Sequence, residues 1–290
     1  YRAAVISLVM LLAAVPAGYA FLLLEYSFKT PLYIAFSLAS LLILTVLLFP
    51  SGGNKTTRIL GNQKSIDERD AIFHRFFRLR PGTPQYIRFY REHPQLLKTD
   101  EQIRELPGLE GEKARTYDPQ TTPFFAATFD ITESLFHDIE RPPDPKKNVS
   151  ARSSPQELTN RLKGFARFLG ADLVGITRLN RAYIYSRIGR SPGPWGAPVT
   201  LNHSYAIVIA VEMEYDFIRH APHHIVTTES SVKYLKAGTA ALALSRYIQK
   251  IGFPARAHVD GNYRVLCTPL AVDAGLGELG RMGLLITPQF

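Results

Sequence analysis

The sequence predicts an α/β sandwich preceded by two transmembrane helices. Two long uncharged stretches lie within residues 1–50, and helical patterns alternate with short apolar runs from Ser154 onward. Such alternation is typical of a domain built from packed layers of helices and strands. The order is not a regular strand–helix–strand repeat, so the pattern does not indicate a doubly wound parallel sheet.

Residues 1–50 are predicted to form a transmembrane helical hairpin. Residues 3–24 and 31–49 contain no charged side chain, and each stretch can cross a hydrocarbon core of about 30 Å at about 1.5 Å per residue. Neither stretch has the polar face that a helix in a soluble core would show. Because Lys55 and Arg58 follow the second stretch, the positive-inside rule predicts a multi-pass protein of the inner membrane whose large domain faces the cytoplasm.

A linker at residues 51–64 precedes an N-terminal helical and irregular unit at residues 65–150. Ser65 and Glu68 match the S-x-x-E capping box of a helix start. Residues 110–150 are rich in Pro, Asp and Thr. This composition predicts irregular structure that wraps over a core.

Aromatic and Arg side chains are mixed within this unit. Phe73, Phe76 and Phe77 follow the first capping box at helical spacing, and a second helix is predicted from about Pro84. Aromatic and basic residues together can stack nucleic-acid bases. At helical spacing the same mixture is more typical of an amphipathic helix with a solvated basic face, so we expect no nucleic-acid partner.

Composition limits the chemistry available to the chain. The formal net charge is +9, but the basic residues are scattered without a run of five, which favours a solvated and partly membrane-facing surface. Cys267 is the single cysteine, which excludes an internal disulfide and a Cys-rich metal site within these residues. Adjacent side chains such as His223 and His224 rarely share one ion, so no metal site is predicted.

Residues 151–290 are predicted to form the main α/β domain. Ser154 and Glu157 match a second capping box, and Gly170 ends the helix that follows. A long helix is predicted over residues 228–251, with Gly252 as its stop. The predicted strands are residues 173–176, 204–213, 255–259 and 284–286.

The most informative stretch is A-G-L-G-E-L-G-R-M-G-L-L-I-T-P at residues 274–288. Gly275, Gly277 and Gly280 spell the G-x-G-x-x-G of dinucleotide-binding proteins. That fingerprint leaves a strand and opens a helix, whereas this one leaves a predicted helix and precedes a strand. A nicotinamide site is therefore disfavoured, and both a structural turn and a turn that binds another cofactor remain open.

The same stretch resembles the glycine-rich turn of reductive dehalogenases, which are corrinoid- and iron–sulfur-dependent enzymes, and more loosely that of epoxyqueuosine reductases. The string D-E-R-D-x-x-F-x-R at residues 67–75, with the later His93-Pro94 pair, is similar to an N-terminal unit of reductive dehalogenases. Epoxyqueuosine reductases generally lack that unit. The resemblance covers residues 65–290 and is strongest toward the C-terminal end.

The resemblance implies a nitroreductase-like, corrinoid-binding catalytic domain at residues 151–290. It implies an oxidoreductase that replaces the halogen of a small organohalide by hydrogen, with cobalamin as cofactor and an electron donor protein or domain as partner. Two [4Fe–4S] clusters are expected from residues beyond Phe290. The alternatives are an epoxyqueuosine reductase-like tRNA-modification enzyme and a catalytically inactive, membrane-anchored binding protein that keeps the fold.

Site residues follow from the resemblance, position by position. Tyr234 stands before a run of small helical residues and would donate the proton, and Asn262 would bind near the halogenated carbon or orient the tyrosine. Tyr263-Arg264 stand where the family usually has Asp-Thr, which leaves the type of organohalide open. His258 would contact the corrinoid. The glycine turn would bind it through Gly275, Gly277, Gly280 and Arg281.

Two observations bear on the identity of the proton donor. Tyr234 lies near the predicted start of the long helix, where the helix dipole would lower the pKa of the phenol below its usual value of about 10. Asp260 is a competing acid, because epoxyqueuosine reductases use an aspartate as proton donor. The residues alone leave both candidates open.

Overall fold

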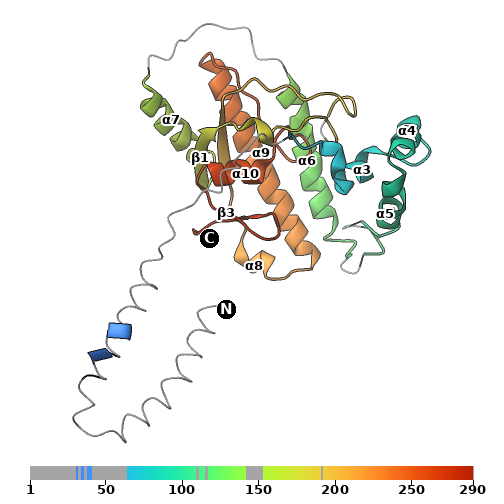
Figure 1. Cartoon of the computed structure of the whole chain (residues 1–290), viewed down its shortest axis with the longest axis horizontal. Coiled ribbons are helices and arrows are strands. Elements are labelled where there is room, and N and C mark those ends of the chain that lie inside the picture. Colours follow the sequence, from blue (N-terminus) through green and yellow to red (C-terminus); the bar gives the residue numbers. More distant parts are fainter. Residues whose placement is uncertain are drawn as a thin grey trace, which may run out of the picture. The chain divides into compact units, whose positions relative to one another are not determined.

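Figure 1 shows the computed structural model of the chain, which describes residues 31, 34–35, 38–40, 64–108, 111–114, 117–141, 153–190 and 192–289. The chain divides into two compact units, Tyr1–Lys55 and Thr56–Phe290. The described residues of the first unit are helical. The uncharged stretches at 3–24 and 31–49 lie mainly outside the described residues, and so does almost all of the linker at 51–64.

The fold class predicted from the sequence needs correction. Where the structure is described, no helix combines the length and the apolar character that a membrane crossing requires. The 27-residue helix α9 (His224–Lys250) includes Glu229, Lys233 and Arg246, and an Asp, Lys or Arg costs about 2.5–3.5 kcal/mol at the centre of a membrane helix. The described part is a helix-rich, mixed α/β fold, and the expected location at the inner membrane stays a prediction.

Helices dominate the second unit (Figure 1). Its helical elements are η1 (Glu68–Asp70), α3 (Ile72–Arg78), α4 (Pro84–Glu92), α5 (Pro94–Arg104), α6 (Pro123–Glu140), α7 (Pro155–Phe168), η2 (Arg181–Tyr183), α8 (Tyr215–Ile218), α9 (His224–Lys250) and α10 (Cys267–Asp273). Its strands are β1 (Leu173–Arg178), β2 (Tyr205–Ala210), β3 (Glu278–Leu279) and β4 (Leu285–Ile286). They form two separate antiparallel pairs, β1 with β2 and β3 with β4.

The centre of the second unit is the pair of helices α6 and α9, which lie side by side (Figure 1). Gly238 of α9 allows this close approach, because a Cβ there would meet the side chain of Leu135 at 3.2 Å. Further along, the ring centroids of Phe129 and Tyr234 lie 5.8 Å apart. The helix from the 65–150 segment and the helix from the 151–290 segment therefore share one core.

The prediction of irregular structure at residues 110–150 is wrong for α6. Phe129, Phe136 and Ile139 recur at helical spacing and are at least half buried, whereas Asp130 is exposed. The Asp and Thr residues that suggested a loop are accommodated on a helix whose apolar stripe packs on α9. Tertiary burial of this stripe outweighs the weak local propensity of the segment.

A second core joins α7 to the first sheet. β1 and β2 pair antiparallel, with Gly175 opposite Val208. The capping box predicted at Ser154 and Glu157 is confirmed, and Gly170 follows the helix with a φ of 97°. The buried cluster behind the sheet consists of Leu162, Ala166, Ala171, Val174 and Leu244.

Two predicted helix starts are displaced. The capping box at Ser65 does not form, because Asp67 caps η1 and the buried side chain of Glu68 accepts the backbone N–H of Gly189 at 2.5 Å. Local spacing cannot reveal such a long-range contact. The long helix begins at His224, earlier than predicted.

The segment at residues 255–259, predicted as a strand, is not part of either sheet. Side chains bind its backbone instead, and Gln249 Nε2 donates to the carbonyl of Ala255 at 2.8 Å. The chain then turns at Gly261, whose φ of 78° lies in the left-handed region that favours glycine. A Cβ at Gly261 would also meet Phe136 of α6 at 2.6 Å, so this turn packs tightly on the helix.

Candidate functional site

Ionisable side chains from separate segments meet beside α9. The loop after η2 supplies Arg190, α9 supplies Tyr234, and the turn at Gly261 leads into α10. Electrostatic interactions connect the phenol of Tyr234 with its neighbours across these segments. We call this group the Tyr234 cluster; it consists of Arg190, Tyr234, Asp260, Tyr263 and Cys267.

A bidentate ion pair organises the Tyr234 cluster. Arg190 Nη1 donates to Asp260 Oδ1 at 3.1 Å, and Nη2 donates to Oδ2 at 2.8 Å. The Tyr263 hydroxyl also donates to Oδ1, at 3.5 Å. A guanidinium has donors only, so each carboxylate oxygen of Asp260 accepts one hydrogen bond from Arg190.

Tyr234 is an accessible acid of the cluster, with 41% of the residue exposed. It lies about three turns after His224, beyond the first turn over which the helix dipole acts. Burial raises the pKa of the phenol, Asp260 raises it further, and Arg190 opposes them. The predicted lowering of this pKa is therefore wrong, and the phenol keeps its proton at neutral pH.

Asn262 is fully buried, and its amide is used within the protein. Arg256 Nη2 donates to Asn262 Oδ1 at 2.6 Å, and Asn262 Nδ2 donates to Glu140 Oε1 at 3.2 Å. Arg256 Nη2 also donates to Glu140 Oε1 at 2.6 Å. These contacts tie the turn that carries Asp260 and Tyr263 to the end of α6, and a direct contact between Asn262 and substrate stays a prediction.

His258 is a neutral imidazole at the start of the same turn. Its Nδ1 accepts the backbone N–H of Arg264 at 3.1 Å and lies 3.3 Å from Arg256 Nη1. Burial lowers the pKa of His258 to about 3, and nearby positive charges act in the same direction. Because donors approach Nδ1, we assign the ring proton to Nε2. Across the described residues, no group of three or more His, Cys, Asp or Glu side chains could hold a metal ion.

A cavity of about 520 Å³ lies beside β2 and the C-terminal half of α9. Its walls include Leu244, Ile248 and Phe253, and His258 and Cys267 line the same space. Cys267 lines the cavity, and part of its surface is exposed there. Protein atoms nevertheless surround the thiol, and this desolvation raises the pKa of the thiol to about 12. Apolar walls with a few polar groups are typical of a small-molecule or cofactor site.

The glycine turn serves the packing of its own hairpin. Gly275 leaves α10 with a φ of 76°. A Cβ at Gly277 would clash with the carbonyl oxygen of Ile286, and one at Gly280 would meet the Ile286 side chain at 2.8 Å. Arg281 is exposed at the tip of the hairpin. Contact of these residues with a corrinoid stays a prediction, because β3–β4 packing alone accounts for two of the glycines.

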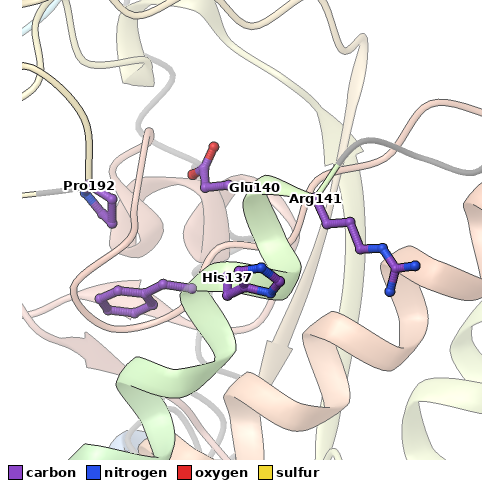
Figure 2. A pocket seen from close by; sticks show the side chains of 5 residues that line it. His137, Glu140, Arg141 and Pro192 are labelled. Atoms are coloured by element: carbon purple, nitrogen blue, oxygen red, sulfur yellow. The ribbon is translucent and has the colours of Figure 1, made fainter.

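A shallow pocket of about 430 Å³ lies at the C-terminal end of α6 (Figure 2). It is lined by Phe136, His137, Glu140, Arg141 and Pro192. In Figure 2 the side chain of Arg141 extends away from Pro192. Glu140 also binds Asn262 and Arg256. The pocket therefore lies next to the hydrogen-bond network that these three residues form.

Sequence reasoning missed Arg190, Glu140 and Arg256, which organise the site. Arg190 lies 70 positions from Asp260 along the chain, and Glu140 lies 116 positions from Arg256. Pairs at such separations leave no periodic signal in a single sequence. Each partner is an ordinary charged residue until the fold brings the two together.

The chain is similar in sequence to curated reductive dehalogenases. It is 32% identical over 173 residues to the tetrachloroethene reductive dehalogenase of Dehalobacter restrictus, a match that covers 47% of this chain and 31% of that protein. The tetrachloroethene reductive dehalogenase of Sulfurospirillum multivorans is 28% identical over 177 residues, covering 52% of this chain and 34% of that protein. The chain thus spans about a third of the length of these relatives. No family model matches it.

Two solved structures share the fold. The catabolic reductive dehalogenase NpRdhA in complex with 3-bromo-4-hydroxybenzoic acid aligns with a TM-score of 0.50 at 23% identity, covering 60% of this chain and 25% of that chain. A reductive dehalogenase whose structure suggests a mechanism for B12-dependent dehalogenation also aligns with a TM-score of 0.50, at 24% identity and with the same coverage of 60% and 25%. In fold, and in sequence over about half of its length, this chain is similar to the reductive dehalogenases.

Proposed function

We propose that this chain is part of a reductive dehalogenase, an oxidoreductase that replaces a carbon-bound halogen by hydrogen. The overall change is R–X plus two electrons and one proton, giving R–H plus X⁻. The substrate would be a small organohalide, and the electrons would come from a donor protein or domain. The sequence similarity to tetrachloroethene reductive dehalogenases supports this reaction class.

One observation carries the proposal: the accessible phenol of Tyr234 keeps its proton beside a fixed ion pair. Its pKa lies above the usual value of about 10, so this phenol, like an unperturbed tyrosine, carries its proton at neutral pH, as a general acid requires. In the proposed step, Tyr234 Oη transfers this proton to the carbon from which the halide has left. The phenolate that forms would be stabilised by the positive charge of Arg190, and a proton from solvent would restore the phenol.

The residues present fit one side of a corrinoid. The cavity beside β2 has apolar walls and a neutral imidazole at His258. Cys267 lines this cavity and is also one of the groups that raise the pKa of the Tyr234 phenol. When bound, a corrinoid supplies the two-electron chemistry at the carbon–halogen bond, and the protein supplies position and electrostatics.

The proposal includes two [4Fe–4S] clusters that deliver electrons. A cluster of this type is held by four cysteine thiolates, whereas Cys267 is the single cysteine of these 290 residues. Its thiol pKa of about 12 also disfavours the thiolate that binds metal. The cluster ligands would therefore come from residues outside this sequence.

The Arg190–Asp260 ion pair disfavours the epoxyqueuosine reductase-like alternative. An aspartate proton donor needs one carboxyl oxygen that carries a proton and faces the substrate. Both oxygens of Asp260 accept hydrogen bonds from Arg190, and the side chain is only 9% exposed. The more exposed phenol of Tyr234 is better placed for proton donation.

Halide release by the full-length protein tests the proposal. The protein would be purified with its corrinoid, supplied with a chemical reductant, and offered a chlorinated ethene and a brominated phenol in separate assays. We expect halide release in step with formation of the dehalogenated product from at least one of them, and none from protein lacking the corrinoid. Corrinoid-loaded, reduced protein that releases no halide from either compound would contradict the proposal.

A further inference from the structure

We propose that Arg190 is a positioning residue for the proton donor: held between the N-terminal helices and Asp260, it fixes the arrangement of charges around the Tyr234 phenol. This inference rests on the proposed function of Tyr234. It assigns to η1 and α3 a part in the site, although both belong to the N-terminal segment. Three sets of contacts carry it.

The first set joins Arg190 to Asp260. Two N–H···O bonds of 3.1 and 2.8 Å, one from each terminal nitrogen to a different oxygen, hold the carboxylate against the guanidinium. The two side chains are 19% and 9% exposed, so the pair is largely shielded from water. A lysine could supply the charge but not this planar fork, so arginine is needed for the geometry.

The second set joins Arg190 to two aromatic rings of α3. Its Cζ lies 4.9 Å from the ring centroid of Phe73 and 5.4 Å from that of Phe77. The two rings stand edge to face, with 4.7 Å between centroids. Both phenylalanines are about half exposed, so burial alone does not account for their placement. Attraction between the guanidinium and the ring faces does account for it.

The third set holds the backbone on both sides of Arg190. Before it, Gly189 N donates to Glu68 Oε2 at 2.5 Å, and a Cβ at Gly189 would meet the Glu68 backbone at 2.7 Å. After it, Arg78 of α3 donates to the carbonyls of Arg190 and Gly193 at 3.2 and 2.8 Å. The loop therefore cannot move without breaking contacts to η1 and α3.

These contacts determine which charges Tyr234 experiences. The groups that act on it are Asp260 and Tyr263 from the turn, Cys267 from α10, and Arg190 from the loop. The helix α6 adds the uncharged ring of Phe129. Among these groups Arg190 alone is a cation, and it lowers the pKa of Tyr234 while Asp260 raises it. Burial has the largest effect on this pKa, and the position of the Arg190 guanidinium determines how far the effect of Asp260 is opposed.

Titration of the Tyr234 phenol in the full-length protein tests the inference. Tyrosine labelled with ¹³C at Cζ reports the protonation of each phenol by NMR, and a Tyr234→Phe variant identifies the relevant signal. Arg190→Met should move the Tyr234 titration to higher pH, whereas Asp260→Asn should move it to lower pH. Opposite directions are not expected from a general loss of structure.

A second variant acts at a distance. Phe73→Leu combined with Phe77→Leu leaves every charge in place and loosens Arg190, so we expect a smaller shift in the direction of Arg190→Met. If Arg190→Met fails to fold, Arg190→Lys replaces it, because lysine keeps the charge and loses the fork. A Tyr234 titration that is unchanged in a folded Arg190 variant would overturn the inference.

Turnover separates this inference from the proposed function. Misplacing a catalytic group by about 1 Å can cost on the order of 100-fold, so the Arg190 variants should release halide about 10- to 100-fold more slowly. The phenol titration needs no turnover. If the Tyr234 titration shifts as expected but the protein never dehalogenates, the role of Arg190 is supported and the proposed reaction is refuted. If the protein dehalogenates but the Arg190 variants show no shift, the proposed reaction is supported and the role of Arg190 is refuted.

Discussion

A buried ion pair in the N-terminal helices allows a quantitative prediction about stability. The side chains of Arg75 and Asp100 are 4% and 2% exposed. Arg75 Nε donates to Asp100 Oδ2 at 2.6 Å, Nη2 donates to Oδ1 at 2.9 Å, and the Tyr90 hydroxyl donates to Oδ2 at 2.7 Å. Asp100→Asn preserves the shape of the side chain but leaves the charge of Arg75 buried without a counter-charge.

Removal of one partner from such a pair destabilises a protein by about 3–5 kcal/mol. For a folded unit of this size, that loss corresponds to a decrease in Tm of roughly 6–20 °C. Tyr90→Phe removes one hydrogen bond to the carboxylate and should cost about 1–3 kcal/mol. Asp216→Asn is the matched control, because its pair with Arg219 is 79% and 54% exposed and should contribute at most about 1 kcal/mol.

The pH dependence gives the sign of the effect. Burial raises the pKa of Asp100, but hydrogen bonds from Arg75 and Tyr90 outweigh burial and hold this pKa below its usual value. A carboxyl of this kind stabilises the fold above its unfolded pKa of about 3.9, and the stabilisation is lost as pH falls through the folded pKa. Urea unfolding should therefore show the full difference between wild type and Asp100→Asn at pH 7 and a smaller one below about pH 4. A variant with an unchanged Tm at pH 7 would refute the reasoning.

Two further predictions concern the turn residues. Gly277→Ala should destabilise the protein by about 1–3 kcal/mol, because its Cβ would clash with the carbonyl of Ile286. Gly164→Ala is the control and should be neutral or stabilising, because a Cβ at this helical site meets no atom within 4 Å. Equal thermal melts for the two variants would contradict this prediction. His258, with its pKa lowered to about 3, should show no imidazole titration by NMR between pH 5 and 8. The neutral form of His258 stabilises the fold above about pH 6.5, the unfolded pKa of histidine, and this stabilisation is lost as pH falls toward the folded pKa. An NMR titration midpoint of His258 near pH 6.5 would contradict the prediction.

Local chemistry was sufficient to predict part of the fold. The side chains of Ser154 and Glu157 bind each other's backbone N–H groups within one turn, so residues 154–157 alone were enough to predict the start of α7. Gly170 adopts a positive φ after that helix, as a glycine at a helix end often does. The apolar run at β1 and the long helix α9 were likewise predicted from periodicity, although α9 begins earlier than predicted.

The rest depends on contacts between distant residues. Glu68 looked like part of a capping box, yet it binds Gly189 across the fold. The resemblance pointed to Tyr234 as the proton donor, and that role stays a prediction. The expected effect of the helix dipole on the pKa of Tyr234 had the wrong sign, because burial and Asp260 raise it instead. Arg190 carries no local signal at all, since its partners come from α3 and from the turn at Gly261.

In the proposed dehalogenation Tyr234 donates the proton, and removal of its hydroxyl tests this most directly. Tyr234→Phe keeps the ring that packs on Phe129 and removes only the hydroxyl. General acid catalysis typically contributes about 10²–10⁴-fold, so halide release by the full-length variant, with its corrinoid retained, should fall by that factor. Tyr215→Phe, which alters an exposed tyrosine of α8, should leave the rate unchanged. A Tyr234→Phe enzyme that releases halide within about threefold of the wild-type rate would contradict the account.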